Sequence, residues 1–199
     1  MEQRRAERAR GRSSAAIARR RKKRMRQMIL IGVAVLALAG TSVFAYQRIT
    51  RVEPGEFVRD AGRTHIADDV TGTGYTSDPP TSGPHWSSVA RWGVHQEPVP
   101  NETQIHNLEH GGVIMQYSCA DCPEIVVELE GLANSCDVKL ITAPRPDMEH
   151  LIAVTAWNRI LTLDAMDREQ IVEFINAYAD KGPERFPSES ASWNRCNVS

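Results

Sequence analysis

The feature that most constrains this chain is a stretch of 19 uncharged, mostly apolar residues from Met28 to Tyr46. As a helix this stretch would be about 28 Å long, close to the bilayer hydrocarbon thickness of roughly 30 Å. A helix so long and so apolar is rarely the core helix of a domain of ordinary size. The sequence therefore predicts a transmembrane helix over residues 28–46, in contact with the lipid bilayer.

The charges around this stretch predict its orientation. Residues 1–27 hold 12 of the 24 Lys and Arg but only two of the 25 acidic residues, so the rest of the chain is acidic. Because a Lys/Arg excess stays cytoplasmic, we expect a basic cytoplasmic tail over 1–27 and an extracytoplasmic C-terminal part in a single-pass protein of the cell membrane. The tail is a topology determinant with anionic lipid as its candidate partner, and the acidic remainder argues against nucleic acid. A signal peptide cleaved near Val43-Phe44-Ala45 is the alternative.

The outer part begins with residues 47–63, which have mixed charge and few apolar residues and are expected to form a stalk. The extracytoplasmic domain is predicted over 64–199. Its first part, up to residue 101, is rich in Gly and Pro with little periodicity, which favours a long ordered loop with a functional role.

Regular patterns follow this loop. We expect helices over 102–110 and 123–133 and a last helix capped by Asp167, with strands over 113–117, 138–142, 151–156 and 160–163. This strand–helix–strand–strand–helix order predicts an α/β (α+β) fold, a small mixed sheet with helices packed on it. Thioredoxin-like folds share the order.

Four histidines occupy distinctive positions in this part of the chain. His106 and His110 are four residues apart, which places both rings on one face of a helix, at a spacing that lets them bind one metal ion. The sequence predicts a transition-metal site, zinc or copper, formed by His85, His106 and His110, with His65 as a further ligand. Glu109 is expected to orient one of the imidazoles without binding the metal ion itself.

Two other interpretations of these histidines stay open. They are a hydrogen-bonded polar network and a metal-free catalytic site. The order His-x-x-Glu-His also occurs in enzymes whose Glu activates a metal-bound water. No catalytic residue is assigned from the sequence, and whether the chain is an enzyme is left open.

All four cysteines lie beyond the apolar stretch, so we expect disulfides. A helix over 123–133 would separate its ends by about 16 Å, whereas a disulfide needs Cα atoms within about 7 Å. This favours Cys119–Cys122 with Cys136–Cys196, the alternative being Cys196 bonded to a member of the first pair.

Cys119 and Cys122 lie between a strand and a helix, which is the setting of a thiol–disulfide oxidoreductase and also of a structural staple. A purely structural or interaction domain of the cell envelope is the third candidate function.

Two strings carry a resemblance to a known family: Pro-Pro-Thr-Ser-Gly-Pro-His-Trp at 79–86 and His-Asn-Leu-Glu-His-Gly-Gly at 106–112. With Thr-Ala-Trp-Asn-Arg at 155–159, the chain resembles the bacterial domain of unknown function 3105 family over roughly residues 60–180. The resemblance implies a single N-terminal membrane helix and an exported domain, but no established activity. It also implies a shared site at the four histidines and Glu109. Asn158 departs from the family pattern, which usually has Gly there.

Overall fold

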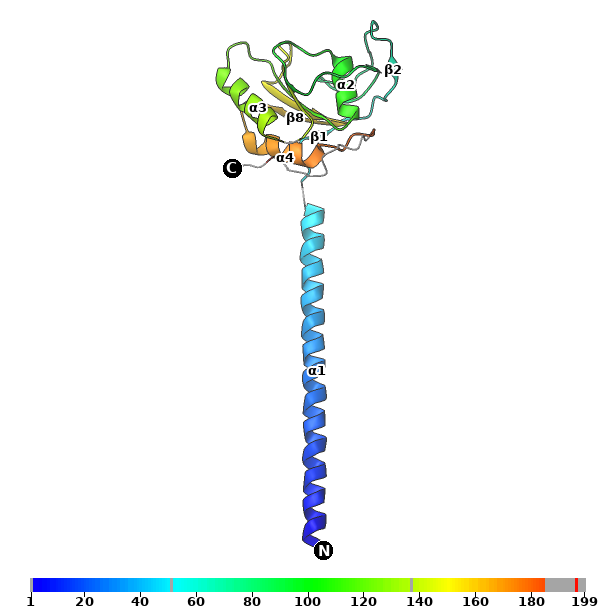
Figure 1. Cartoon of the computed structure of the whole chain (residues 1–199), viewed down its shortest axis with the longest axis vertical. Coiled ribbons are helices and arrows are strands. Elements are labelled where there is room, and N and C mark those ends of the chain that lie inside the picture. The colour runs from blue at the N-terminus through cyan, green and yellow to red at the C-terminus, as the bar shows by residue number, and fades with distance from the viewer. Residues whose placement is uncertain (1, 51, 137, 185–195, 197–199) are drawn as a thin grey trace. The chain divides into compact units, whose positions relative to one another are not determined.

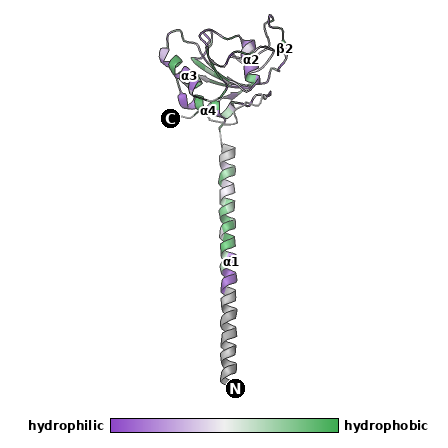
Figure 2. Cartoon of the chain, viewed as in Figure 1, coloured by the Kyte–Doolittle hydropathy of each residue, from purple (hydrophilic) through white to green (hydrophobic). Residues whose placement is uncertain are grey.

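The structure is a computed structural model that describes residues 2–50, 52–136, 138–184 and 196. The chain divides into two compact units, Met1–Val52 and Glu53–Ser199. The first unit consists of helix α1 (Glu2–Thr50). Figure 2 shows a hydrophobic band along α1 that follows a hydrophilic segment.

The hydrophobic band lies within Arg21–Tyr46, a segment of 26 residues that is long and apolar enough to cross a membrane. None of its side chains is buried by protein. Large apolar side chains exposed in this way suit a lipid environment. A signal sequence near an N-terminus meets the same criteria of length and composition.

The second unit is built on a six-stranded mixed sheet with the order β1-β8-β7-β5-β6-β4. Strand β5 is parallel to β6, and β6 is parallel to β4, whereas β7 is antiparallel to both β5 and β8 and β8 is antiparallel to β1. Figure 1 shows these strands between the helices. The bounds are β1 (Glu56–Phe57), β4 (Gly93–Val94), β5 (Val113–Tyr117), β6 (Leu140–Pro144), β7 (Ile152–Ala156) and β8 (Arg159–Leu163).

Helices cover both faces of this sheet. Helices α3 (Pro123–Ser135) and α4 (Arg168–Tyr178) pack on one face, whose core includes Val113, Met115 and Val154. Helix α2 (Asn101–Glu109) contributes Leu108 to the other face, where it packs with Ile114 of β5. Because side chains alternate along a strand, β5 feeds both cores and is buried along its whole length.

The predicted mixed α/β class is confirmed, and the expected order runs β5-α3-β6-β7-β8-α4. Asp167 caps α4 as expected, accepting a hydrogen bond of 3.0 Å from the Gln170 backbone N–H. The sequence missed strands β1 to β4, each of only two residues, because so short a strand leaves no period to detect. Strand β1 lies within the segment 47–63 that was expected to be a stalk.

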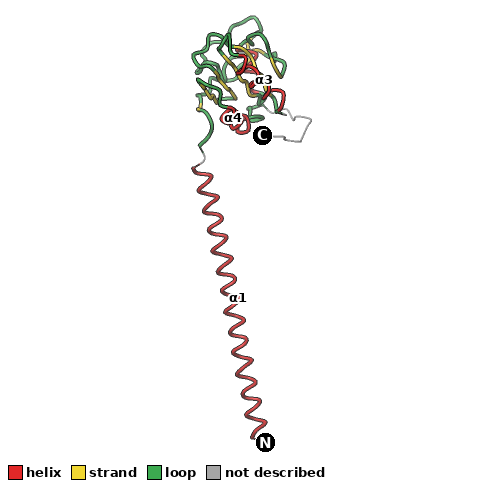
Figure 3. The backbone as a smooth tube through the Cα atoms, turned by 90° about the vertical axis from the view of Figure 1, so that its left-hand side faces the viewer, coloured by secondary structure: helices red, strands yellow, loops and turns green. Residues whose placement is uncertain are grey.

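Strands β2 (His65–Ile66) and β3 (His85–Trp86) form a separate parallel pair. Between them and around them the chain runs as loop and turn, which Figure 3 shows in green. The Gly- and Pro-rich part of the chain is therefore an ordered loop region with two short strands in it. This region and α2 form the part of the unit that holds the histidines.

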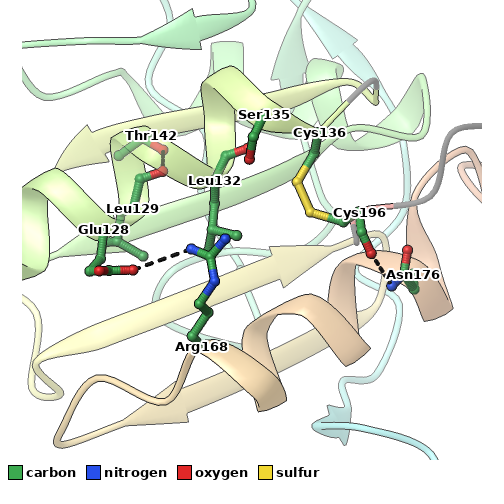
Figure 4. Close-up of a disulfide and its surroundings, with 9 residues drawn as sticks. All are labelled: Glu128, Leu129, Leu132, Ser135, Cys136, Thr142, Arg168, Asn176 and Cys196. Carbon is green, nitrogen blue, oxygen red and sulfur yellow. Dashed lines mark hydrogen bonds and ion pairs between the residues drawn. A yellow bond between two sulfur atoms is a disulfide. The ribbon is translucent and has the colours of Figure 1, made fainter. Parts of the chain in front are cut away.

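The cysteines form the two pairs that the length of the predicted helix favoured. Cys119 and Cys122 form a disulfide with Cα atoms 5.8 Å apart, and Cys136 and Cys196 form a second with Cα atoms 4.7 Å apart. Figure 4 shows the second disulfide at the end of α3, where the Asn176 side chain of α4 donates a 2.9 Å hydrogen bond to the Cys196 carbonyl.

Candidate metal centre

The short parallel pair β2–β3 places two histidines side by side. His65 is the register partner of His85, and the His85 backbone N–H donates to the Thr64 carbonyl at 3.0 Å. Gly83 continues the pairing by donating to the Gly62 carbonyl at 2.7 Å. Its φ of +130° is a backbone conformation that suits glycine, so the turn before His85 depends on this residue.

Helix α2 supplies the other two histidines and the glutamate. His106 and Glu109 are three residues apart on the helix, and His110 is its C-cap. Gly111 ends the helix with φ +78°, and a Cβ there would lie 2.7 Å from the Cα of Asp180. The segment after α4 thus runs tightly along the end of α2, where the Glu184 backbone N–H donates to the Glu109 carbonyl at 3.1 Å.

A buried polar network fixes the loop that carries His85 against α2. Glu102 of α2 is buried and accepts a 2.8 Å hydrogen bond from the Gly72 backbone N–H. The Tyr75 hydroxyl donates to the Pro84 carbonyl at 3.1 Å and lies 3.4 Å from the Glu102 carboxylate. Burial, reinforced by that carboxylate, raises the pKa of Tyr75 to about 12, so the hydroxyl stays a donor. The loop that carries His85 is therefore held both by its pairing with β2 and by these contacts with Glu102 and Tyr75.

The four imidazoles lie next to one another. Ring centroids are 4.7 Å apart for His65 and His85, 5.0 Å for His65 and His106, and 5.2 Å for His85 and His106. The His106 and His110 centroids are 4.6 Å apart. The sequence-predicted histidines thus converge from β2, β3 and α2.

These rings form two groups of closely spaced ligand atoms that share His106. One group is His65, His85 and His106, and the other is His106, His110 and Glu184; within each group the ligand atoms lie within 4.8 Å of one another. Two nitrogens bound to one zinc ion at about 2.0–2.1 Å are roughly 3.3 Å apart in a tetrahedron. The ligand atoms of the first group would then have to move closer together by up to about 1.5 Å to bind one ion.

Backbone carbonyls fix the tautomers of the two most buried rings. His85 Nδ1 donates to the Gly83 carbonyl at 2.8 Å, and His106 Nδ1 donates to the Trp86 carbonyl at 2.7 Å. A carbonyl oxygen can only accept, so both Nδ1 atoms carry the proton. In the neutral rings the lone pair is therefore on Nε2.

Glu109 lies against the Nε2 atoms of His85 and His65. Its Oε2 is 2.9 Å from His85 Nε2 and 3.6 Å from His65 Nε2. Because His85 Nδ1 already carries a proton, a hydrogen bond at Nε2 requires one further proton, shared between the ring and the carboxylate. Proton and metal ion would compete for this position.

The side chains of this group differ in how far they are exposed to solvent. The His85 side chain is 0% exposed and that of Glu109 is 5% exposed, whereas the His65 side chain is 49% exposed. Burial lowers the pKa of His106, the Trp86 carbonyl opposes this, and the neighbouring imidazoles lower it further. His106 is thus held in the neutral form that binds metals, and His65 forms the solvent side of the group.

The remaining histidines lie apart from the group, whereas Glu184, which the sequence did not predict, lies beside it. His95 bonds the Arg91 carbonyl at 2.6 Å and His150 pairs with Asp164, so neither belongs to the group. Glu184 was missed by sequence reasoning, and no local pattern marks it. Its Oε2 is 3.9 Å from His110 Nδ1. Asn158 has φ +57° between β7 and β8, which explains why a glycine suits this position.

Fold and site together define a mixed α/β domain with a buried histidine–glutamate cluster on its loop-rich side, in a chain that also carries an apolar helix. The chain belongs to the DUF3105 family, described as proteins of unknown function, whose family model matches residues 67–191. His85, His106, Glu109, His110 and Glu184 lie inside the matched range, and His65 lies just before it. No curated protein and no solved structure matches the chain.

Proposed function

We propose that this chain is a membrane-anchored protein whose extracytoplasmic domain binds one divalent transition-metal ion through His65, His85 and His106. The observation that carries the proposal is the pair of hydrogen bonds from the Nδ1 atoms of His85 and His106 to backbone carbonyls. Histidines that bind metals almost always donate their other ring N–H in this way, which fixes the ring and directs Nε2 at the ion.

We propose a role for Glu109 that differs from the orienting role expected from the sequence. The carbonyls of Gly83 and Trp86 already hold the orienting nitrogens, and the carboxylate faces the Nε2 side of His85 and His65. We therefore assign Glu109 as a fourth ligand. Three neutral imidazoles and one carboxylate are a donor set that zinc accepts, and copper also binds imidazole well.

His110 and Glu184 provide a second position for the same ion. His106 belongs to both groups, and its Nδ1 is occupied by the Trp86 carbonyl. A single nitrogen of His106 then serves one ion at a time. The Glu184 and His65 side chains are each 49% exposed, so each position has one ligand at the solvent. The expected stoichiometry is one ion per chain.

The anchoring part of the proposal rests on α1. Its apolar segment has the length and composition of a membrane span, and the basic residues on its N-terminal side favour a cytoplasmic N-terminus. Anionic lipid would bind the basic tail. Trypsin added to intact spheroplasts is expected to digest residues 53–199 while the tail stays protected; protection of the outer unit, or its release without α1, would contradict the anchored orientation.

Metal analysis of the full-length protein tests the binding proposal. The protein is purified in detergent, stripped with chelator, and titrated with zinc or copper, and bound metal is measured after desalting. About one ion per chain is expected for the wild type and for the control His95→Gln, and little or none for His106→Gln. Equal metal content in wild type and His106→Gln, or no retained metal in any of them, would overturn the proposal.

A further inference from the structure

A second chemistry is placed at the opposite face of the sheet from the histidines. Helix α3 carries a disulfide at each end: Cys122 is its N-cap residue and Cys136 is its C-cap residue. Both bonds are formed within the same unit, yet their surroundings differ in exposure and in electrostatic setting. We infer that Cys119–Cys122 exchanges with dithiols of other polypeptides, whereas Cys136–Cys196 is a structural bond.

Exposure separates the two disulfides first. Cys136 and Cys196 are 8% and 3% exposed and belong to the core, with α4 packed beside them (Figure 4). Cys119 and Cys122 are only partly buried, at the edge of the same core. Thiol–disulfide exchange requires a thiolate to approach a sulfur in line with the bond, so only the first disulfide is open to attack by another protein.

The helix separates them a second time. Partial positive charge from the first N–H groups of α3 favours a thiolate on Cys122, whereas the partial negative charge at the other end disfavours one on Cys136. Asp121 and Glu124 are exposed carboxylates beside the first pair and oppose the effect through solvent. The two ends of one helix thus make one disulfide easier to reduce than the other.

Strand and loop geometry present the first disulfide to a partner. The Cys-x-x-Cys segment follows the central strand β5 and precedes α3, within the parallel unit β5-α3-β6. This is the placement of redox-active Cys-x-x-Cys motifs. The Ser118 backbone N–H donates to the Leu151 carbonyl at 3.0 Å, which ties the residue before Cys119 to the chain that leads into β7.

The same geometry assigns an order of events. A thiolate of a substrate dithiol attacks Cys119 Sγ, the Cys119–Cys122 bond breaks, and its electron pair leaves on Cys122, the sulfur at the helix N-terminus. The second substrate thiolate then attacks the substrate sulfur of the mixed disulfide, and Cys119 leaves as a thiolate. The substrate dithiol is oxidised to a disulfide and the Cys119–Cys122 pair is reduced, and the two thiol protons of the substrate pass through solvent to the two cysteines.

Graded reduction of the full-length protein tests the inference. The wild-type protein in detergent is equilibrated with mixtures of reduced and oxidised glutathione, its free thiols are alkylated, and peptides are identified by mass spectrometry. Cys119 and Cys122 are expected to be reduced at a glutathione ratio at which Cys136 and Cys196 remain fully oxidised. Reduction of all four cysteines together, at a single midpoint, would overturn the inference.

A trapping experiment tests the assigned order with a matched pair of variants. Cys122→Ser leaves Cys119 as a free thiol and is expected to accumulate mixed disulfides with an unfolded, partly oxidised substrate such as scrambled ribonuclease, at least severalfold more than Cys119→Ser does. Both variants keep Cys136–Cys196, and circular dichroism checks their fold. Equal trapping by the two variants, or none by either, would contradict the assignment. Neither outcome affects the metal site, which lies on the other face of the sheet.

Discussion

Replacing Glu109 by Gln separates a ligand from a mere neighbour of the histidines. The amide keeps the size of the side chain and can donate to His85 Nε2, so the contact of 2.9 Å is retained without the charge. A charge-assisted hydrogen bond is worth about 1 kcal/mol more than a neutral one, so the metal-free variant loses about 1 kcal/mol of unfolding free energy. Its fold is expected to be unchanged.

The effect on metal binding is larger. At a zinc concentration of 100 times Kd, the wild type gains about 2.7 kcal/mol. With binding weakened about 100-fold by the loss of the anionic ligand, the variant gains only about 0.4 kcal/mol at the same concentration. In a unit of about 150 residues, 1 kcal/mol corresponds to roughly 2–4 °C in Tm. Zinc should therefore raise Tm by about 5–11 °C in the wild type and by about 1 °C in Glu109→Gln.

Tryptophan fluorescence of the full-length protein in detergent measures this difference. All four Trp lie in the unit of residues 53–199, so their signal reports its unfolding and not that of α1. His95→Gln serves as the control and should keep the wild-type shift. A zinc-induced shift in Glu109→Gln as large as that of the wild type would refute the assignment of Glu109 as a ligand.

Three further predictions concern stability. Gly111→Ala should lower the unfolding free energy by about 1–3 kcal/mol in urea denaturation, because φ is +78° and a Cβ would meet the Asp180 backbone; an unchanged urea midpoint would contradict the close packing. Converting Cys136 and Cys196 together to Ser should cost about 4 kcal/mol, as expected for a loop of 60 residues, and a loss below 1 kcal/mol would show that the bond is dispensable. Hydrogen bonds from Gln170 lower the pKa of Asp167 below its unfolded value near 3.8. The stabilisation by this N-cap is therefore present above that pKa and is lost as the pH falls through the lower pKa of the folded state. The Tm difference between the wild type and Asp167→Ala should be full at pH 7 and smaller at pH 3, and an equal difference at both pH values would refute this.

The local parts of the site could be predicted from the sequence. His106 and His110 share a helix face because they are four residues apart, and the glycines after them end the helix as expected. The convergence of His65 with His85 depends instead on a parallel pair of two-residue strands, which leaves no periodic signal. His65 was predicted as a further ligand, but no pattern in the sequence indicated its pairing with His85.

Other parts of the site had no signal in the sequence. The groups that orient His85 and His106 are backbone carbonyls, which any residue provides. Glu184 reaches the group because the chain after α4 packs against Gly111, across two helices and four strands of intervening sequence. The mixed sheet was easier, since β5 to β8 are long enough to show their apolar pattern, whereas the two-residue edge strands β1 and β4 are set by pairing alone.

X-ray absorption at the zinc edge of the zinc-loaded, full-length protein tests the central claim most directly. The account predicts three imidazole nitrogens at about 2.0–2.1 Å with one carboxylate oxygen at about 2.0–2.2 Å, and one imidazole fewer in His85→Gln. A shell of oxygen atoms without imidazole scattering, or a spectrum that His85→Gln leaves unchanged, would contradict it.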